Sequence, residues 1–237
     1  ADSERVGGLV GFNAGSISNS HSIGSVSGFS SVGGLVGSNQ HTISNSYSAC
    51  EVSGYVSRDG MVAYRIGGLA GSNSDAVSGC YCTGSVIGTE YVGGLVGWNI
   101  GSISDSYSTG SASGEDNVGG LVGENHKGTV SNCYSTGIVS GRDSVGGLVG
   151  RNEDNVGGLV GRNYDGTVSN SFWDTETMWQ ASSAAGTGRT TAEMQDIATF
   201  SGAGWSIVAV ANPDTRDPSH IWNMVGGQTY PFLSWET

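Results

Sequence analysis

The chain has 237 residues, of which 42 are glycine, and the glycines follow no Gly-X-Y triplet of the collagen type. Charged residues make up 13% of the chain, and six tryptophans and nine tyrosines are too many for a disordered segment. The formal net charge of −12 argues against nucleic acids and anionic membranes as partners, because both are bound through Lys and Arg. No apolar run approaches the roughly 20 residues of a membrane-spanning helix, so we expect no membrane insertion.

The sequence Val-Gly-Gly-Leu-Val-Gly recurs, with small variations, through the first two thirds of the chain. Its leucines are Leu9, Leu35, Leu69, Leu95, Leu121, Leu148 and Leu159. The basic interval is 26 residues; an interval of 34 indicates an eight-residue insertion within Tyr55–Tyr64, and one of 11 indicates a truncated unit at Val145–Asn155. We expect Val145–Gly150 to stack on Val118–Gly123. The alternative is that it loops out and Val156–Gly161 takes that place.

Each unit continues from the glycine motif into an asparagine, a β-branched residue, an aromatic residue and a second short strand. We expect the asparagine column to form a corner, because Asn tolerates the left-handed backbone conformation. Its members are Asn13, Asn39, Asn73, Asn99, Asn125 and Asn163. Three short extended pieces in each unit, without helical periodicity, are typical of one coil of a β-helix. The sequence therefore predicts an all-β fold, a right-handed parallel β-helix (β-solenoid) with coils of about 26 residues over residues 1–173.

Coils that stack about 4.8 Å apart place each side chain on its counterpart in the next coil. We therefore expect the leucines to form one buried stack, with Leu9, Leu35, Leu95 and Leu121 among them. The aromatic column is expected to stack along one surface or corner, where its rings are candidates for binding sugars. The candidate ligand-binding residues are Tyr47, Tyr81, Tyr107 and Tyr134.

The repeats resemble the GLUG motif, which is named for Gly-Leu-any-Gly and occurs here as Gly8-Leu9-Val10-Gly11, Gly34-Leu35-Val36-Gly37 and Gly94-Leu95-Val96-Gly97. The resemblance covers residues 1 to about 173. It implies a large secreted or cell-surface protein of bacteria or archaea, of the filamentous-haemagglutinin-like adhesin type, or a non-catalytic part of an immunoglobulin A peptidase. The motif carries no catalytic signature, so the resemblance implies location and architecture rather than activity.

An acidic residue stands two positions before several copies of the glycine motif, at Glu4, Glu90, Asp116, Asp143 and Asp154. Stacked like charges repel one another. The column is therefore either a solvated ridge that salt screens and basic neighbours relieve, or a ridge bridged by Ca²⁺, which prefers carboxylate and carbonyl oxygens. Ser30 and Tyr64 interrupt the column. We therefore expect any calcium site in the later coils, at Glu90, Asp116, Asp143 and Asp154.

The four cysteines, Cys50, Cys80, Cys82 and Cys133, do not suggest an obvious disulfide pairing. Cys80 and Cys133 share a column but lie two coils apart, which is beyond disulfide reach. Cys50 and Cys82 lie on neighbouring coils but are offset by two columns. We expect buried free thiols that act as small hydrophobic side chains, with one Cys50–Cys82 bridge as the alternative.

The period disappears after Trp173, and residues 174–237 are predicted to form a C-terminal capping segment. Thr190-Thr191-Ala192-Glu193 has the form of a capping box and predicts a helix that runs to about Thr199. Because an open β-helix end exposes strand edges and core, we expect large side chains of the cap to cover it. These are Trp205, Trp222, Tyr230, Phe232, Leu233 and Trp235. The first coil has no such cap, so we expect an upstream segment or another molecule to cover it.

Candidate catalytic groups are sparse. The histidines lack metal-ligand spacing, no Gly-x-Ser-x-Gly elbow joins a strand to a helix, and Asp105 is the only acid within the central strand columns. These patterns favour a non-enzymatic structural or adhesive module of a surface protein. Its expected partners are copies of itself, in end-to-end filaments, other surface proteins, or glycans. The alternative is a β-solenoid that binds carbohydrate or ice, and a carbohydrate-active enzyme is the third and least favoured class.

Overall fold

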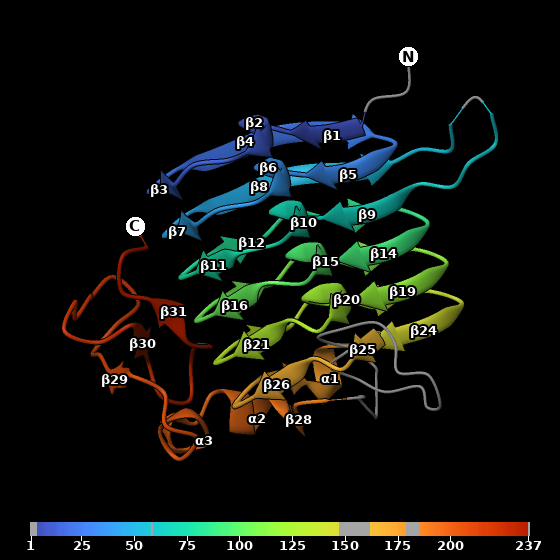
Figure 1. The fold of residues 1–237 in the computed structure, drawn as a ribbon. Coiled ribbons are helices and arrows are strands. Elements are labelled where there is room, and N and C mark those ends of the chain that lie inside the picture. Colours follow the sequence, from blue (N-terminus) through green and yellow to red (C-terminus); the bar gives the residue numbers. More distant parts are fainter. Residues whose placement is uncertain (1–3, 58, 147–161, 179–184, 237) are drawn as a thin grey trace.

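The computed structural model describes residues 4–57, 59–146, 162–178 and 185–236, and the strands of its repeats stack in successive coils (Figure 1). Among these residues, strands of neighbouring coils pair in parallel, and the register joins residues one repeat apart. Val10 pairs with Val36, and Val96 pairs with Val122. The predicted all-β parallel solenoid is therefore confirmed.

The coils of the described residues build four parallel sheets, and the first three have one short strand from each coil. Sheet 1 contains β1 (Glu4–Gly7), β5 (Ser30–Gly33), β9 (Tyr64–Gly67), β14 (Glu90–Gly93), β19 (Asp116–Gly119) and β24 (Asp143–Gly146). Sheet 2 contains β2 (Val10–Asn13), β6 (Val36–Asn39), β10 (Ala70–Asn73), β15 (Val96–Asn99), β20 (Val122–His126) and β25 (Arg162–Tyr164). Sheet 3 contains β3 (Ile17–Ser18), β7 (Ile43–Ser44), β11 (Ala76–Ser78), β16 (Ser102–Ser104), β21 (Thr129–Ser131) and β26 (Thr167–Ser169).

Sheet 4 carries the longer return stretch of each coil, which is continuous in the first two coils and broken in the next three. Its strands are β4 (His21–Gly28), β8 (Tyr47–Gly54), β12 (Tyr81–Cys82), β13 (Val86–Ile87), β17 (Tyr107–Ser108), β18 (Ala112–Ser113), β22 (Tyr134–Ser135), β23 (Val139–Ser140), β27 (Phe172–Asp174) and β28 (Thr187–Arg189). A coil thus passes through four sheets, where the sequence pattern had predicted three extended pieces. The difference arises in the glycine motif, which is a bend between two strands: β1 ends at Gly7, and β2 begins only at Val10.

Glycine is required in this motif because the backbone comes too close to its neighbours for any side chain. A Cβ atom built on Gly94 would lie 2.1 Å from the carbonyl oxygen of Gly120 and 2.5 Å from Oγ of Ser108 in sheet 4. A Cβ atom on Gly97 would lie 2.6 Å from the backbone of Arg65 in sheet 1. We call this zone of contact between the glycine motif and sheets 1 and 4 the glycine waist.

The glycine waist separates two lobes of hydrophobic core. The first lobe lies among sheets 2, 3 and 4 and contains Leu35, Val36 and Ile43. The second lies between sheets 1 and 4 and contains Val32 and Val52. Each position of the motif therefore has a distinct task. Its first valine enters the second lobe, its leucine and second valine enter the first, and its glycines let the sheets touch.

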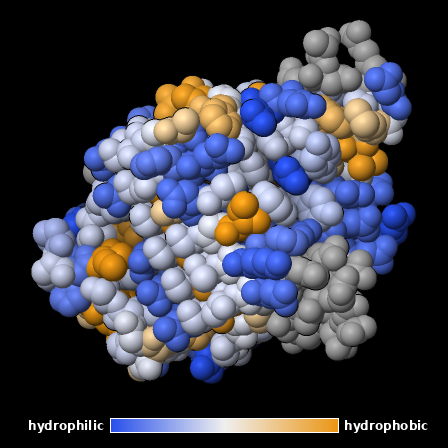
Figure 2. Space-filling model, viewed as in Figure 1, coloured by the Kyte–Doolittle hydropathy of each residue, from blue (hydrophilic) through white to orange (hydrophobic). Residues whose placement is uncertain are grey.

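The leucine of the motif is buried wherever coils lie on both sides of it. Leu35, Leu69, Leu95 and Leu121 are fully buried, which confirms the predicted stack for these coils. The prediction is wrong for Leu9, whose side chain is 48% exposed because only the second coil packs on it. Hydrophobic atoms are visible at this end of the solenoid in Figure 2. Leu148 and Leu159 lie outside the described residues.

The asparagine column is a buried ladder rather than the predicted left-handed corner. Asn39, Asn73 and Asn99 each donate a hydrogen bond from Nδ2 to Oδ1 of the next asparagine at 2.8 Å, and the acceptor of the last of these three bonds is Asn125. The same amide of Asn73 also holds its own turn, because it donates to the carbonyl oxygen of Asp75 at 3.1 Å. Asn suits this position because its amide can bond both to a buried backbone carbonyl oxygen of its own turn and to the asparagine of the neighbouring coil. The side chain of Asn163 is outside the described part of the chain.

The left-handed corner lies instead two residues before the aromatic column. Backbone φ is positive at Asn19, Asn45, Gly79, Asp105, Asn132 and Asn170. A second left-handed column follows the acidic column and consists of Arg5, Ser31, Arg65, Tyr91, Asn117 and Ser144. All six members of the first column are Asn, Asp or Gly, the residues that adopt this conformation at least cost.

The two irregular repeats are accommodated at different places. The insertion leaves the solenoid as a loop between β8 and β9, and Tyr64 then returns to its register opposite Ser30 (Figure 1). The truncated unit begins in register, because Val145 pairs with Val118 as expected. The next described strand, β25, belongs to sheet 2. The remainder of both copies, residues 147–161, lies outside the described residues.

The C-terminal segment closes the core with few residues and then turns back along the coils (Figure 1). Its elements after β27 are α1 (Thr175–Met178), β28, α2 (Thr191–Met194), α3 (Ile197–Ser201), β29 (Ile207–Ala209), β30 (Trp222–Met224) and β31 (Phe232–Leu233). Trp173 and Met178 are buried at the end of the first core lobe, and β28 adds a strand to β27. The six large side chains predicted to cover this end do not do so. All but Phe232 pack against the aromatic column on sheet 4, while Phe232 lies under Arg216.

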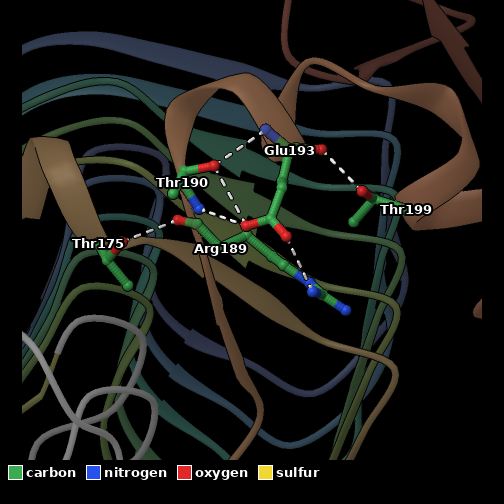
Figure 3. Close-up of polar contacts among 5 residues, drawn as sticks. All are labelled: Thr175, Arg189, Thr190, Glu193 and Thr199. Atoms are coloured by element: carbon green, nitrogen blue, oxygen red, sulfur yellow. Dashed lines mark hydrogen bonds and ion pairs between the residues drawn. The ribbon is translucent and has the colours of Figure 1, made fainter.

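The predicted capping box is present at the start of α2 (Figure 3). Oγ1 of Thr190 accepts a hydrogen bond from the backbone N–H of Glu193 at 3.2 Å, and Oε2 of Glu193 accepts from that of Thr190 at 2.9 Å. The predicted single helix to Thr199 is wrong, because Asp196 acts as a second N-cap and starts α3. Thr199 joins the two helices by donating to the carbonyl oxygen of Glu193 at 2.8 Å.

Replacing Gly94 by alanine tests the glycine waist. The new methyl group would collide with the carbonyl oxygen of Gly120, so we expect the free energy of unfolding to fall by about 3 kcal/mol in urea titrations. Gly226→Ala is the matched control, because a Cβ atom there has no neighbour within 4 Å. Equal unfolding midpoints for the two variants would contradict the conclusion that the glycine waist has no room for a side chain.

Candidate functional site

An aromatic ladder runs along the outer side of sheet 4. The ring centroids lie 4.8 Å apart for Tyr47 and Tyr81, 5.0 Å for Tyr81 and Tyr107, and 4.9 Å for Tyr107 and Tyr134, with nearly parallel planes. His21 extends the stack beyond Tyr47 at 4.9 Å. The spacing is that of the coils, so the predicted stacking of the four tyrosines is confirmed. Their binding of a ligand stays a prediction.

The C-terminal segment covers one half of this ladder. Trp222 packs on Tyr107 and Tyr134, with centroids 6.1 and 5.8 Å away, and Trp235 packs on Tyr81 at 5.6 Å. As a result Tyr107 and Tyr134 are only 6% and 2% exposed. The uncovered part of the ladder is the end near the first coil.

The cover limits which of the four predicted ligand-binding rings a sugar could reach. Tyr107 and Tyr134 are part of an internal interface and are not accessible. In the uncovered part of the ladder the faces of the Tyr47 ring are occupied by His21 and Tyr81, so that Tyr47 offers mainly its edge and hydroxyl group. Sugars usually stack on ring faces, and the ladder as a whole therefore lacks the geometry of a stacking platform.

Polar groups beneath the cover are paired within the chain. The hydroxyl of Tyr134 donates to the carbonyl oxygen of Pro231 at 2.6 Å, and that of Tyr230 donates to Oδ2 of Asp174 at 2.6 Å. Glu236 accepts a hydrogen bond from the backbone N–H of Leu233 at 2.7 Å. Burial raises the pKa of the Glu236 carboxyl above its usual value, because the charged form loses its hydration.

A hollow of about 250 Å³ lies where the cover ends. It is lined by Asn19, Ser20, His21, Asn45, Tyr47 and Trp235. Two left-handed corners place the asparagines there, and the ladder and the last residues of the chain supply the rings. The sequence alone did not indicate this hollow, because Trp235 is about 190 residues from the repeats that it meets.

A second hollow, of about 290 Å³, lies on the other side of Trp235 and contains Ser219 and His220. Asp217 is nearby, but the three residues do not form a catalytic triad. Nδ1 of His220 lies 3.1 Å from Oγ of Ser219 and 3.8 Å from Oδ2 of Asp217. A triad needs its acid and its nucleophile on opposite ring nitrogens, so this group is not arranged for nucleophilic catalysis.

The acidic column lies in one register along sheet 1. Glu90 pairs with Asp116, and Asp116 pairs with Asp143. Arg142 lies 3.6 Å from a carboxylate oxygen of Glu115 and 3.7 Å from one of Asp143, and these side chains are largely exposed. Among the described residues no group of three or more His, Cys, Asp or Glu side chains is arranged to hold a metal ion. Asp154 lies outside the described residues, and calcium binding stays a prediction.

All four cysteines are buried free thiols, as expected, and no Cys50–Cys82 bridge is present. Cys80 and Cys133 occupy a column otherwise filled by serines and copy their hydrogen bond: each Sγ contacts the carbonyl oxygen two residues earlier, at 3.2 and 3.1 Å. Burial raises the pKa of the Cys80 and Cys82 thiols to about 12. They are therefore protonated at neutral pH, and their role is to fill the core.

The fold and its ladders define the chain as a repeat protein of the parallel β-solenoid class. The model of the GLUG motif matches residues 2–27, 88–113, 114–140 and 154–172, which supports a GLUG-repeat protein. No curated protein matches the chain at a significant level. Among the described residues, no helix has the length and apolar character needed to cross a membrane.

One solved structure resembles the chain over nearly its whole length. It is that of a putative immunoglobulin A1 protease from Bacteroides ovatus, with a TM-score of 0.61 and 18% sequence identity. The match covers 95% of this chain and 70% of that one. At this identity the likeness concerns the fold alone.

The thiols provide a direct test of core packing. Because the thiolate is the reactive form and the thiols are buried, we expect none of the four to react with Ellman's reagent in the native protein. All four should react after denaturation. A rise in intact mass on reduction would contradict the free-thiol assignment and indicate a disulfide.

The carboxyl of Glu236 predicts how stability depends on pH. Its folded pKa is raised above the ordinary 4.5, so its contribution to stability is complete below about pH 4.5 and is lost as pH rises through the folded pKa. We expect Glu236→Gln to raise the melting temperature relative to the parent at pH 7, with a smaller difference at pH 4. Glu115→Gln, at an exposed acid, is the control. A Glu236→Gln effect that does not shrink at acidic pH would contradict the assignment.

Proposed function

We propose that this chain is an extracellular structural module, a stiff stalk segment of a bacterial or archaeal surface protein. The observation that carries the proposal is the continuity of its ladders. Backbone pairs, the asparagine amides and the aromatic rings each repeat from coil to coil. An array joined in this way transmits load along its axis and offers few loops to proteases.

The comparisons also support an extracellular repeat protein. Matches to the GLUG motif support a repeat protein of a kind found outside the cell. The buried, protonated thiols are compatible with an oxidising exterior, because they are not accessible for disulfide exchange. An adhesive role would require a surface that binds a partner in addition to this stalk.

Head-to-tail filaments are not part of the proposal. Stacking one copy on the last coil of another would require the last coil to present free edges and an open core. In the structure Trp173 and Met178 fill that end of the first lobe, and β28 already pairs with β27. Assembly at this end would therefore have to displace folded chain.

Protease resistance at a cell surface tests the proposal. The chain would be displayed between a membrane anchor and an N-terminal epitope tag, and loss of the tag would be followed during proteinase K treatment. We expect the parent to keep its tag much longer than the Gly94→Ala variant, since cleavage then requires unfolding. Equal rates of tag loss would contradict a stable extracellular stalk.

A further inference from the structure

The end of the C-terminal cover creates a small groove beside the exposed end of the aromatic ladder. Trp235 packs against Tyr81 and goes no further, so that Tyr47 is half-buried and His21 is exposed. Figure 1 shows the end of the chain beside β7 and β11. The 250 Å³ hollow described above lies between Trp235 and the starts of β4 and β8, at His21 and Tyr47.

Its lining combines rings with short neutral polar groups. The amides of Asn19 and Asn45 each offer a donor and an acceptor, and Ser20 adds a hydroxyl group. Tyr47 and Trp235 supply apolar surface next to them. Rings that contact C–H groups, with amides that bind neighbouring hydroxyls, are the chemistry that recognises a sugar ring.

The volume of the hollow and the charge around it limit the kinds of sugar that could bind. The hollow is smaller than the roughly 300–1,000 Å³ of sites for drug-sized ligands, so it suits one ring rather than a long oligomer. His21 is the one ionisable lining group besides the Tyr47 phenol, and the chain has a net charge of −12. An acidic sugar would be repelled, and a neutral one would not.

The indole of Trp235 contributes its ring to this groove, whereas its buried N–H lies beside Gly79, which lines the second hollow. Its Nε1 has no hydrogen-bond partner among the described residues. It lies 3.6 Å from the position that a Cβ atom would take on Gly79, the residue that replaces asparagine in this corner of the third coil.

We propose that the groove formed by Asn19, Asn45, Tyr47 and Trp235 binds a single neutral sugar residue, such as the terminal unit of a surface glycan. The binding is lateral to the solenoid axis. It would add recognition to the stalk, and it stands independently of the stalk function, since a protein with either property can lack the other.

Asn45→Gly is the variant that tests the groove most cleanly. Backbone φ at Asn45 is 46°, which glycine adopts without strain, and Gly79 already occupies the same corner one coil further on. Asn132→Gly is the matched control: φ there is 51° and the corner is equivalent, but it does not line the groove. The two variants should therefore change the backbone alike and the groove differently.

The measurement is NMR titration of the full chain with methyl glycosides of glucose, galactose, mannose and N-acetylglucosamine, and with methyl glucuronide. We expect at least one neutral glycoside to bind, to shift the Trp235 indole N–H resonance, and to bind more tightly than the glucuronide. Asn45→Gly should weaken binding by about fivefold to tenfold, as expected for loss of one or two hydrogen bonds. Asn132→Gly should bind as the parent does.

Three results would overturn the proposal: no shift with any neutral glycoside, equal binding by Asn45→Gly and Asn132→Gly, or tighter binding of the glucuronide. Melting temperatures of the two variants show whether Asn45→Gly is folded. If it is not folded, the resonances that shift in the parent protein show where the ligand binds. Shifts confined to residues remote from Trp235 would overturn the proposal, because they would place the ligand outside the groove.

Discussion

The close approach of backbone to backbone at the glycine waist is the constraint on which the rest of the structure depends. A methyl group at Gly94 or Gly97 would meet backbone atoms at 2.1 to 2.6 Å, so the sheets touch there without side chains between them. This contact fixes the bend between the first two strands of each coil. It also divides the core into two narrow lobes, the first filled mainly by three columns of Leu, Val and Ile and the second mainly by two columns of Val.

Much of the architecture could be predicted from the repeat, because a fixed period with fixed residue types leaves few folds. The leucine stack, the tyrosine stack and the buried thiols follow from column identity alone. Column identity does not tell which way a polar residue points. Asn39 and its counterparts were expected at a corner, whereas their amides face inward and bond to each other. The sequence could not indicate this, because it does not show that a buried backbone carbonyl oxygen lies within reach of each amide.

The C-terminal segment was the least predictable part, because it has no period. Its capping box could be found from four letters, since the bonds of Thr190 and Glu193 are local. The destination of Trp222 and Trp235 could not, because these side chains contact rings more than 80 residues away in sequence. The candidate groove depends on where that segment stops, and it was invisible in the sequence for the same reason.

The packing of the C-terminal segment across several coils also bears on how the solenoid comes apart. In a simple array each coil contacts only its neighbours, and such arrays lose coils from an end one at a time. Here one stretch of chain contacts Tyr81, Tyr107, Tyr134 and Phe172 together, which lie on four successive coils. We therefore expect these four coils to unfold together as one cooperative unit, and the first two coils to open separately. Local stability is then expected to differ between the first two coils and the four that follow, although the repeats are nearly the same in sequence.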